Sequence, residues 1–442
     1  MLKKLLFLML LMPTLLLAQH SINGTFTPAE DFKTAIIYKV TPNESVYVTH
    51  SEIEEDGTFK VELDSTVTKG MYRIVYAMPQ EEFNFDIIYN AAEDVVFTFN
   101  QETGIKFQES IENKLVNSYT NSMSMVSQSI GNFFRQQSTD TLALESIFKT
   151  QKQTQDSFEE AAKNTVALNF IKANRPYIPE GYEDLTTYIS NLQTHFFDHV
   201  DFNNDVLQSS NFLIERTLNY VFGMDAYGED QVTTYVMNTK DVVQAMSEAP
   251  VNIKITLLQV LWQQMVETNF DEVANYISDE FLLPLAKEHE LHELAEQLIT
   301  YKNTSIGALA PDFELETQVN AVKTRTSLHK LEGAKKYLVV FWSSTCGHCL
   351  EEIPQLYSYI NSLEKDTIKV IAVGLEDEPF EWRKLTIEYP EFTHVLGIGK
   401  WDNSIGNSYN VQSTPSYYVL SEDKTILAKP FDFQAFKKWM EE

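Results

Sequence analysis

Cysteine is nearly absent from this chain, since its 442 residues include only two, Cys346 and Cys349. Structural disulfides are common in proteins of oxidising compartments, but they require further cysteines. Here both thiols belong to one Cys-x-x-Cys motif, so a scaffold held together by several disulfides is excluded. A small bridge that only closes a loop is the structural alternative for such a pair.

Long apolar runs are also lacking, apart from one near the N-terminus. There Lys3 and Lys4 precede an apolar run from Leu5 to Leu17, which is followed by Ala18 and polar residues. The run has about 13 residues, whereas a membrane-spanning helix needs roughly 20. We therefore expect a signal peptide over residues 1–18, cleaved near Ala18, and a periplasmic or secreted protein. No cysteine follows the run, so we expect no lipoprotein.

Positive charge is scarce as well. The chain has 34 Lys and Arg against 63 Asp and Glu, and its formal net charge is -29. Nucleic acids and anionic membrane surfaces reward clustered Lys and Arg. The sequence contains no such cluster, which argues against nucleic acid as a partner.

The spacing of apolar residues predicts several domains. Alternation such as that of Phe59, Val61 and Leu63 predicts strands and a β-sandwich-like accessory domain over residues 19–105. Helical spacing then predicts an all-α region over residues 106–302. We assign no ligand to either part.

Strands and helices alternate from residue 303 to residue 442, which predicts an α/β domain. A βαβ unit is followed there by an antiparallel hairpin and a last helix. The expected strands cover 337–341, 368–374, 416–420 and 426–428, and the expected helices follow the cysteine motif, cover 381–389 and begin at Phe431.

Two pairs of histidines have a spacing that places each pair on one helix face. His195 and His199 are four residues apart, and His289 and His292 are three apart. Metal binding requires such spacing together with further ligands. Solvated polar surface is the simpler interpretation, so we predict no metal site and no cofactor.

The cysteine motif joins the end of a strand to the start of a helix. Unpaired N–H groups and the helix dipole favour an anion there, so Cys346 is expected to be the reactive thiolate. Cysteine pKa values in such motifs fall from about 8.5 to about 7 or below. Between the cysteines, His348 is expected to add a favourable positive charge, although a solvated side chain is the alternative.

Cys349 lies one helical turn further on and is expected to face inward as the resolving thiol. It attacks the mixed disulfide formed at Cys346 and needs an acceptor for its proton. Glu352 lies on the same helical face and is expected to accept that proton if it is partly buried. The alternative is a surface glutamate like Glu351.

The segment from Phe341 to Pro354, together with Thr414-Pro415 downstream, resembles the thioredoxin superfamily and its TlpA-like exported branch. The likeness covers residues 303–442. It implies a cis Pro415 against the disulfide and a Thr414 backbone that pairs with an extended substrate. Trp342, at the strand end, is assigned to substrate binding with them.

One departure from thioredoxin supports this branch. Thioredoxin carries a buried acid six residues before its first cysteine, where this chain has Val340. The exported branch instead carries the acid three residues after the second cysteine, which is Glu352 here.

The resemblance implies a thiol-disulfide oxidoreductase that exchanges disulfides with protein substrates and receives electrons from a membrane or periplasmic thiol donor. The direction stays open between reductase and isomerase, because Gly347-His348 resembles the more oxidising disulfide isomerases. A peroxidase would need Thr and Pro where this chain has Ser343 and Val339. The remaining alternative is a non-enzymatic envelope-binding or redox-sensing protein.

Overall fold

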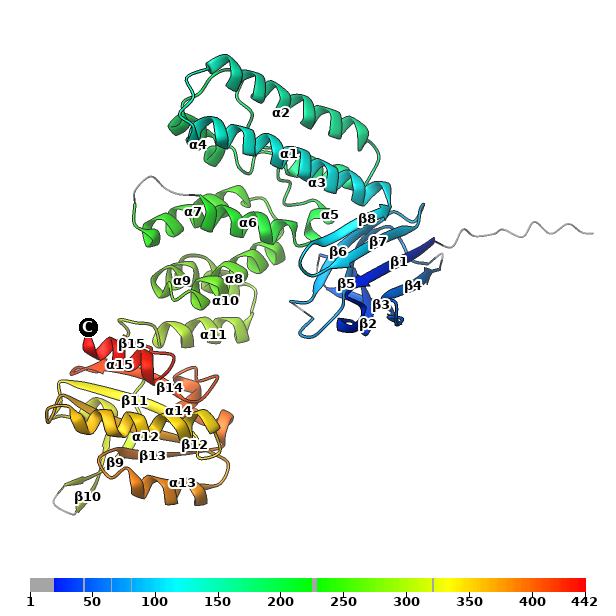
Figure 1. Ribbon diagram of the computed structural model, residues 1–442. Coiled ribbons are helices and arrows are strands. Elements are labelled where there is room, and N and C mark those ends of the chain that lie inside the picture. The colour runs from blue at the N-terminus through cyan, green and yellow to red at the C-terminus, as the bar shows by residue number, and fades with distance from the viewer. Residues whose placement is uncertain (1–19, 43, 65, 81, 225–228, 320–321) are drawn as a thin grey trace, which may run out of the picture. The chain divides into compact units, whose positions relative to one another are not determined.

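The computed structural model describes residues 20–442, apart from 43, 65, 81, 225–228 and 320–321 (Figure 1). The predicted signal peptide lies outside the described residues. The chain forms two compact units divided between Leu261 and Trp262, inside helix α8 (Val251–Glu267). None of the helices in the described part of the chain combines the length and apolar character needed to cross a membrane.

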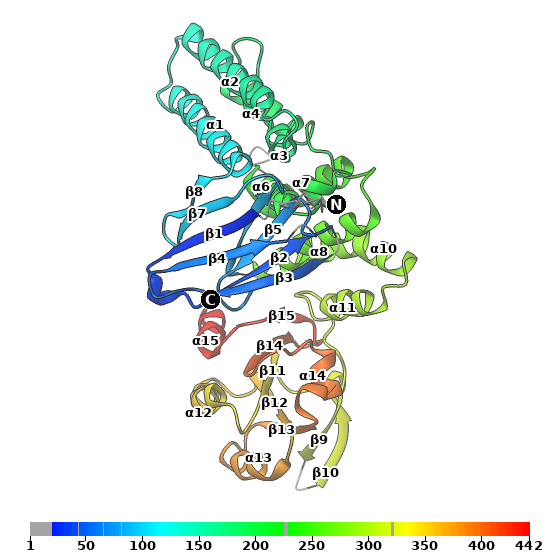
Figure 2. The same ribbon diagram turned by 90° about the vertical axis from the view of Figure 1, so that its right-hand side faces the viewer.

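The first unit begins with two four-stranded sheets, ordered β4-β1-β7-β8 and β3-β2-β5-β6 (Figure 2). The two sheets share one hydrophobic core, which includes Ile22 and Phe97 of the first sheet and Tyr72 and Ile87 of the second. The period-two alternation of the sequence produces this shared core, and the predicted β-sandwich-like domain is confirmed. The strands are β1 (His20–Thr27), β2 (Thr34–Val40), β3 (Ser45–Glu52), β4 (Thr58–Leu63), β5 (Gly70–Val75), β6 (Asn84–Tyr89), β7 (Val95–Asn100) and β8 (Gly104–Glu109).

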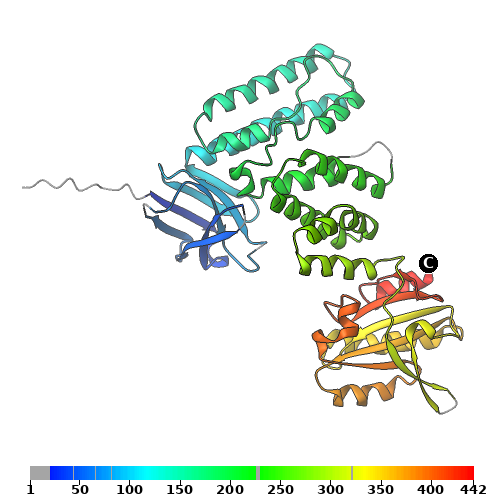
Figure 3. The same ribbon diagram turned by 180° about the vertical axis from the view of Figure 1, so that it is seen from behind.

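Helices make up the rest of the first unit, as predicted, and Figures 1 and 3 show them as a series of packed helices. The first helix begins at Ser110, whose side chain accepts the N–H of Asn113. The second helix begins at Asp140, whose side chain accepts the N–H of Ala143. Before α8 these helices are α1 (Ile111–Arg135), α2 (Thr141–Ala161), α3 (Ala167–Ala173), α4 (Leu185–Thr194), α5 (Asp205–Gln208), α6 (Phe212–Gly223) and α7 (Gln231–Ala245).

Three further helices open the second unit: α9 (Asp271–Ile277), α10 (Leu283–Glu288) and α11 (His292–Asn303). Asp271 accepts hydrogen bonds from the Tyr301 hydroxyl and the Ile306 N–H, and its Oδ2 lies 2.6 Å from Lys429 Nζ. Because Lys429 follows the last strand of the α/β domain, these helices are linked to that domain by an ion pair whose carboxylate is buried.

The α/β domain contains a five-stranded sheet in the order β13-β12-β11-β14-β15, with β11, β12 and β13 parallel and the last two antiparallel. A two-stranded β9-β10 hairpin precedes it. The strands are β9 (Glu314–Val319), β10 (Val322–Ser327), β11 (Lys336–Trp342), β12 (Ile368–Glu376), β13 (Thr393–Ile398), β14 (Ser416–Ser421) and β15 (Ile426–Ala428), and the helices are α12 (Gly347–Ser362), α13 (Pro379–Leu385), α14 (Ser404–Ser408) and α15 (Phe433–Glu441).

The central strand β11 is buried on both faces, which explains its unbroken apolar sequence. Leu338, Val340 and Trp342 belong to the core shared with α12, α13 and α15, whereas Val339 and Phe341 belong to the opposite core. The predicted multidomain architecture with a thioredoxin-like C-terminal fold is therefore confirmed. No range was predicted for strands β9, β10 and β13 or for helix α14. The helix expected over 381–389 lies at Pro379–Leu385 and gives way to a 3-10 turn.

Candidate active site

The cysteine motif occupies the carboxyl edge of the parallel strands, where β11 gives way to α12. Cys346 is the N-cap residue of α12, and its Sγ accepts the N–H of Cys349 at 3.2 Å. Burial by itself raises the pKa of Cys346, but hydrogen bonds from the Cys349 thiol and from the N–H groups of Cys349 and His348 outweigh burial and lower it. A half-buried thiol with a lowered pKa is suited to nucleophilic attack.

Cys349 has the opposite environment. Its side chain is 0% exposed and packs with Ile353 and Leu356 of the same helix. Burial, followed by the neighbouring Cys346 thiol, raises the pKa of Cys349 to about 12. Both cysteines are free thiols in this structure.

Glu352 is half-buried rather than fully exposed like Glu351. Its Oε2 accepts the Tyr417 hydroxyl at 2.7 Å and the Phe433 backbone N–H at 2.8 Å. Three elements that lie far apart in the sequence therefore meet at this carboxylate, namely α12, β14 and α15. The partial burial that a proton acceptor for Cys349 requires is present.

Thr414 lies beside the motif, because the Cys346 thiol donates to its carbonyl oxygen at 3.2 Å. The Thr414-Pro415 peptide bond is cis, as the resemblance implied. Trp342 is only 1% exposed and belongs to the core beneath the motif. Its indole therefore does not reach solvent in this structure, and its assignment to substrate binding stays a prediction.

His348 is exposed, and its side chain has no hydrogen bond or ion pair within the described residues. Its backbone N–H, rather than its ring, contributes to the lowered pKa of Cys346. The predicted electrostatic role of the ring stays a prediction.

A second carboxylate, Glu376, was missed by sequence reasoning. It is 2% exposed at the end of β12 and accepts the Ser344 N–H at 2.6 Å, the Ser344 hydroxyl at 2.8 Å and the Ser343 hydroxyl at 3.4 Å. These bonds fix the loop that leads into Cys346. The available signal was its position at the carboxyl end of a parallel strand, the edge at which α/β folds place their sites.

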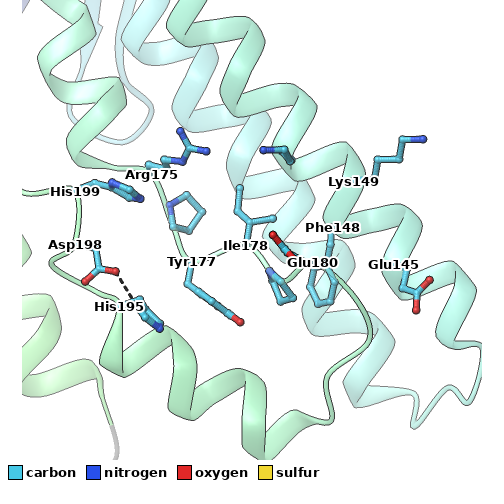
Figure 4. Close-up of a pocket in the computed structure, with 13 residues that line it drawn as sticks. Glu145, Phe148, Lys149, Arg175, Tyr177, Ile178, Glu180, His195, Asp198 and His199 are labelled. Atoms are coloured by element: carbon cyan, nitrogen blue, oxygen red, sulfur yellow. Dashed lines mark hydrogen bonds and ion pairs between the residues drawn. The ribbon is translucent and has the colours of Figure 1, made fainter.

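A hollow of about 720 Å³ in the helical region is lined by His195 and His199, among other residues (Figure 4). His195 stacks on Tyr177 with ring centroids 5.0 Å apart, and its Nδ1 lies 2.7 Å from Asp198. Basic and acidic side chains line the walls together, so charge favours no single class of ligand. No group of three or more His, Cys, Asp or Glu in the described part of the chain is arranged to hold a metal ion.

Comparisons with known sequences match the C-terminal part of the chain. The model of the AhpC/TSA family matches residues 306–429. The thioredoxin-like protein YneN of Bacillus subtilis is 32% identical over 126 residues, which cover 27% of this chain and 68% of that protein. The sporulation thiol-disulfide oxidoreductase A of the same organism is 24% identical over 114 residues, covering 24% of this chain and 68% of that protein.

A comparison with solved structures matched parts of the chain. A domain of a possible thiol-disulfide isomerase from Cytophaga hutchinsonii is 28% identical and covers 31% of this chain and 90% of its own, with a TM-score of 0.26. A thioredoxin-like protein from Bacteroides caccae is 20% identical and covers 60% of this chain and 96% of its own, with a TM-score of 0.31. Because the chain is 32% identical to YneN over 68% of that protein, it belongs, through its C-terminal domain, to the thioredoxin-like family that includes thiol-disulfide oxidoreductases.

Proposed function

We propose that the protein is an exported enzyme that exchanges disulfides with protein substrates through Cys346 and Cys349. The observation that carries the proposal is the contrast between the two thiols. Cys346 is half-buried at a helix N-terminus with a lowered pKa, whereas Cys349 is fully buried with a pKa raised to about 12. A reactive first thiol and a protected second thiol are what sequential exchange requires.

In the reducing direction, the Cys346 thiolate attacks one sulfur of a substrate disulfide. A bond forms between Cys346 and that sulfur, the substrate S–S bond breaks, and the other sulfur leaves as a thiolate. Cys349 then gives up its proton and attacks Cys346, which releases the second substrate thiolate. The two cysteines end as a disulfide, and a thiol donor must reduce them for the next cycle.

Insulin reduction tests the activity. The purified mature protein should accelerate the reduction of insulin by dithiothreitol, and Cys346→Ser should abolish the acceleration. If the wild-type protein has no effect, the enzymatic proposal fails and a redox sensor or binding protein replaces it. A Cys349→Ala variant should trap substrates as mixed disulfides, which mass spectrometry can identify along with the electron donor.

Equilibration with glutathione decides the direction. A reduction potential of about -180 mV would equal that of protein disulfide isomerase and favour reshuffling of strained or mispaired disulfides. A reduction potential of about -270 mV would equal that of thioredoxin and favour a reductase.

Export is proposed from the N-terminal sequence alone, where two lysines precede an apolar run. N-terminal sequencing of protein recovered from the periplasm or medium should give a chain that begins near Gln19. A chain that retains its first residues, or that stays in the cytoplasm, would contradict export.

A peroxidase is the alternative enzyme to consider, because the AhpC/TSA family model matches residues 306–429. Two residues near the cysteine motif argue against it. Val339, at the position where that chemistry needs Pro, is 0% exposed and paired to Ile371 within the sheet. Ser343, at the position of the required Thr, directs its hydroxyl to Thr345 and Glu376. Neither residue supplies the group that peroxide reduction needs.

A further inference from the structure

Cys349 must lose a proton before it can attack the mixed disulfide. Burial raises the pKa of Cys349 to about 12, so at neutral pH the group is held as the thiol rather than the thiolate. The side chain is 0% exposed, which restricts bulk water as the acceptor. A positioned carboxylate one helical turn away is the group that α12 offers, and that group is Glu352.

The Glu352 carboxylate is held through only one of its oxygens. Its Oε2 accepts the Tyr417 hydroxyl at 2.7 Å and the Phe433 N–H at 2.8 Å. Its Oε1 has no hydrogen-bond partner within the described residues. Two donors on one oxygen fix the direction of the carboxylate and leave the other oxygen free to take a proton.

Tyr417 is itself held firmly. Its side chain is 2% exposed, and its ring stacks on Phe436 at 9° between planes, with centroids 6.3 Å apart. Burial, together with the hydrogen bond to Glu352, raises the pKa of Tyr417, and the charge of Cys349 adds to the shift. The phenol therefore remains a donor throughout the working pH range, and it belongs to the same buried core as Cys349.

We propose that Tyr417 is a positioning residue for thiol exchange, which holds Glu352 through Oε2 so that Oε1 accepts the Cys349 proton. This inference rests on the proposed function and adds a residue to its resolving step. The Cys349 S–H bond breaks and a Glu352 O–H bond forms. The Cys349 thiolate then forms the bond to Cys346 Sγ, and the substrate sulfur leaves with the electron pair of the broken mixed disulfide.

A stopped-flow reaction of the reduced mature protein with 5,5′-dithiobis(2-nitrobenzoate) separates the two steps. Attack by Cys346 releases the first thionitrobenzoate, and attack by Cys349 releases the second. Tyr417→Phe keeps the ring and removes only the hydroxyl. We expect it to slow the second release about tenfold or more, without changing the first. The slowed second release should also require a higher pH, because Cys349 then depends on hydroxide.

The neighbouring tyrosine provides a matched control. The Tyr418 hydroxyl donates to the Tyr409 carbonyl rather than to Glu352, so Tyr418→Phe should leave the ratio of the two rates unchanged. Glu352→Gln should slow the second release, and adding Tyr417→Phe to it should slow it no further. If Tyr417→Phe does not fold, Glu352→Asp withdraws the carboxylate from both donors and should give the same selective slowing.

An unchanged second release in Tyr417→Phe would overturn the proposal. So would equal slowing of both releases, or a further loss in the Glu352→Gln background, since either would indicate a general structural effect. Failure of the proposed function has a different signature, because the wild-type protein would then show neither a fast first release nor insulin reduction.

Discussion

Cys346 and Cys349 are only three residues apart at the start of α12, yet Cys346 accepts an N–H at the helix start while Cys349 is buried in the core. The cause is the direction of each side chain, since Cys346 precedes the helix and Cys349 faces the sheet. Helix-start donors stabilise negative charge on Cys346, and burial penalises it on Cys349. The order of the two chemical steps follows from this difference.

Alkylation should reveal this order directly. We expect iodoacetamide to modify Cys346 first in the reduced protein, because the pKa of Cys346 is lowered and that of Cys349 is raised to about 12. Peptide mapping by mass spectrometry gives the rate at each residue as a function of pH. Cys346→Ser should leave Cys349 nearly unmodified at neutral pH, and faster labelling of Cys349 than of Cys346 would reverse the assigned roles.

The contribution of the His348 ring to the reduction potential can be tested by substitution. Its ring is exposed, so solvent screens its charge and we expect His348→Gln to lower the reduction potential by only on the order of 10 mV. The loss of a positive charge disfavours the thiolate form, and the disulfide is unaffected. Equilibration with glutathione measures the potential. If the reduction potential is unchanged, the ring is simply solvated and gives no support to an isomerase-like potential.

Strand β12 shows how packing constrains an element that carries a site residue. Gly374 lies two residues before Glu376, and a Cβ built on Gly374 would lie 2.0 Å from Nε1 of the buried Trp382. The indole therefore occupies the space that any other residue at this position would need. The strand approaches α13 closely only because a glycine is present.

Gly374→Ala should destabilise the second unit by about 1–3 kcal/mol through overpacking. Gly347→Ala is the matched control, because its Cβ would meet nothing within 4 Å. Urea midpoints followed by tryptophan fluorescence measure both. Equal midpoints for the two variants would mean that the Trp382 ring moves aside without cost.

The elements around the motif were predictable because their sequence patterns are strong. A continuous apolar run predicted β11, and a cysteine at the start of an amphipathic segment predicted α12. Strand β13 was missed because Thr393–Ile398 is short, contains Gly397 and is only partly buried. Its place in the sheet depends on pairing with β12, which the local sequence does not specify.

The site could be predicted only where its residues are local in sequence. Cys346, Cys349 and Glu352 share one helix, so their spacing was informative. Tyr417 is 65 residues from its hydrogen-bond partner Glu352. Glu376 is 32 residues from its partner Ser344. Only the tertiary structure brings these two side chains to the site. A tyrosine in a predicted strand carries no sign that its hydroxyl meets a carboxylate.

In the second unit, helices that precede the α/β domain are joined to it by Asp271 and Lys429, whose side chains are 9% and 22% exposed. Burial alone raises the pKa of Asp271, but hydrogen bonds from Lys429 and Tyr301 outweigh it and lower the pKa below 3.8. A carboxylate with a depressed folded-state pKa stabilises the fold above its unfolded pKa of about 3.9. That contribution disappears as the pH falls through the lower, folded value.

Asp271→Asn should therefore cost about 3 kcal/mol at pH 7, as expected when one partner of a buried ion pair is removed. It should also flatten the loss of stability below about pH 4. Denaturation of the mature protein at several pH values measures both effects. Asp279→Asn is the control, because its pair with Lys302 is 37% and 50% exposed and is worth less than about 1 kcal/mol. A similar cost for both variants would contradict the role of burial.

Fragments of the chain test how far the α/β domain depends on these helices. All proposed site residues follow Lys336, so fragments 262–442 and 303–442 should both fold and retain the two-step release of thionitrobenzoate. The shorter fragment lacks Asp271 and Tyr301, so its Lys429 has lost both the carboxylate and the aromatic ring that contact it in the full chain. We expect it to melt at a lower temperature than the longer fragment.

Lys429→Met should have different effects in the two fragments. In 262–442 it leaves the buried Asp271 without its cation and should destabilise the fold by about 3 kcal/mol. In 303–442 Asp271 and Tyr301, which contact Lys429 in the full chain, are both absent, so the substitution should change the melting temperature little. Thermal unfolding of the two fragments and their two variants measures both effects. An equal loss in both fragments would show that Lys429 contributes through its methylene packing, and inactivity of 303–442 alone would show that α9 to α11 complete the active site.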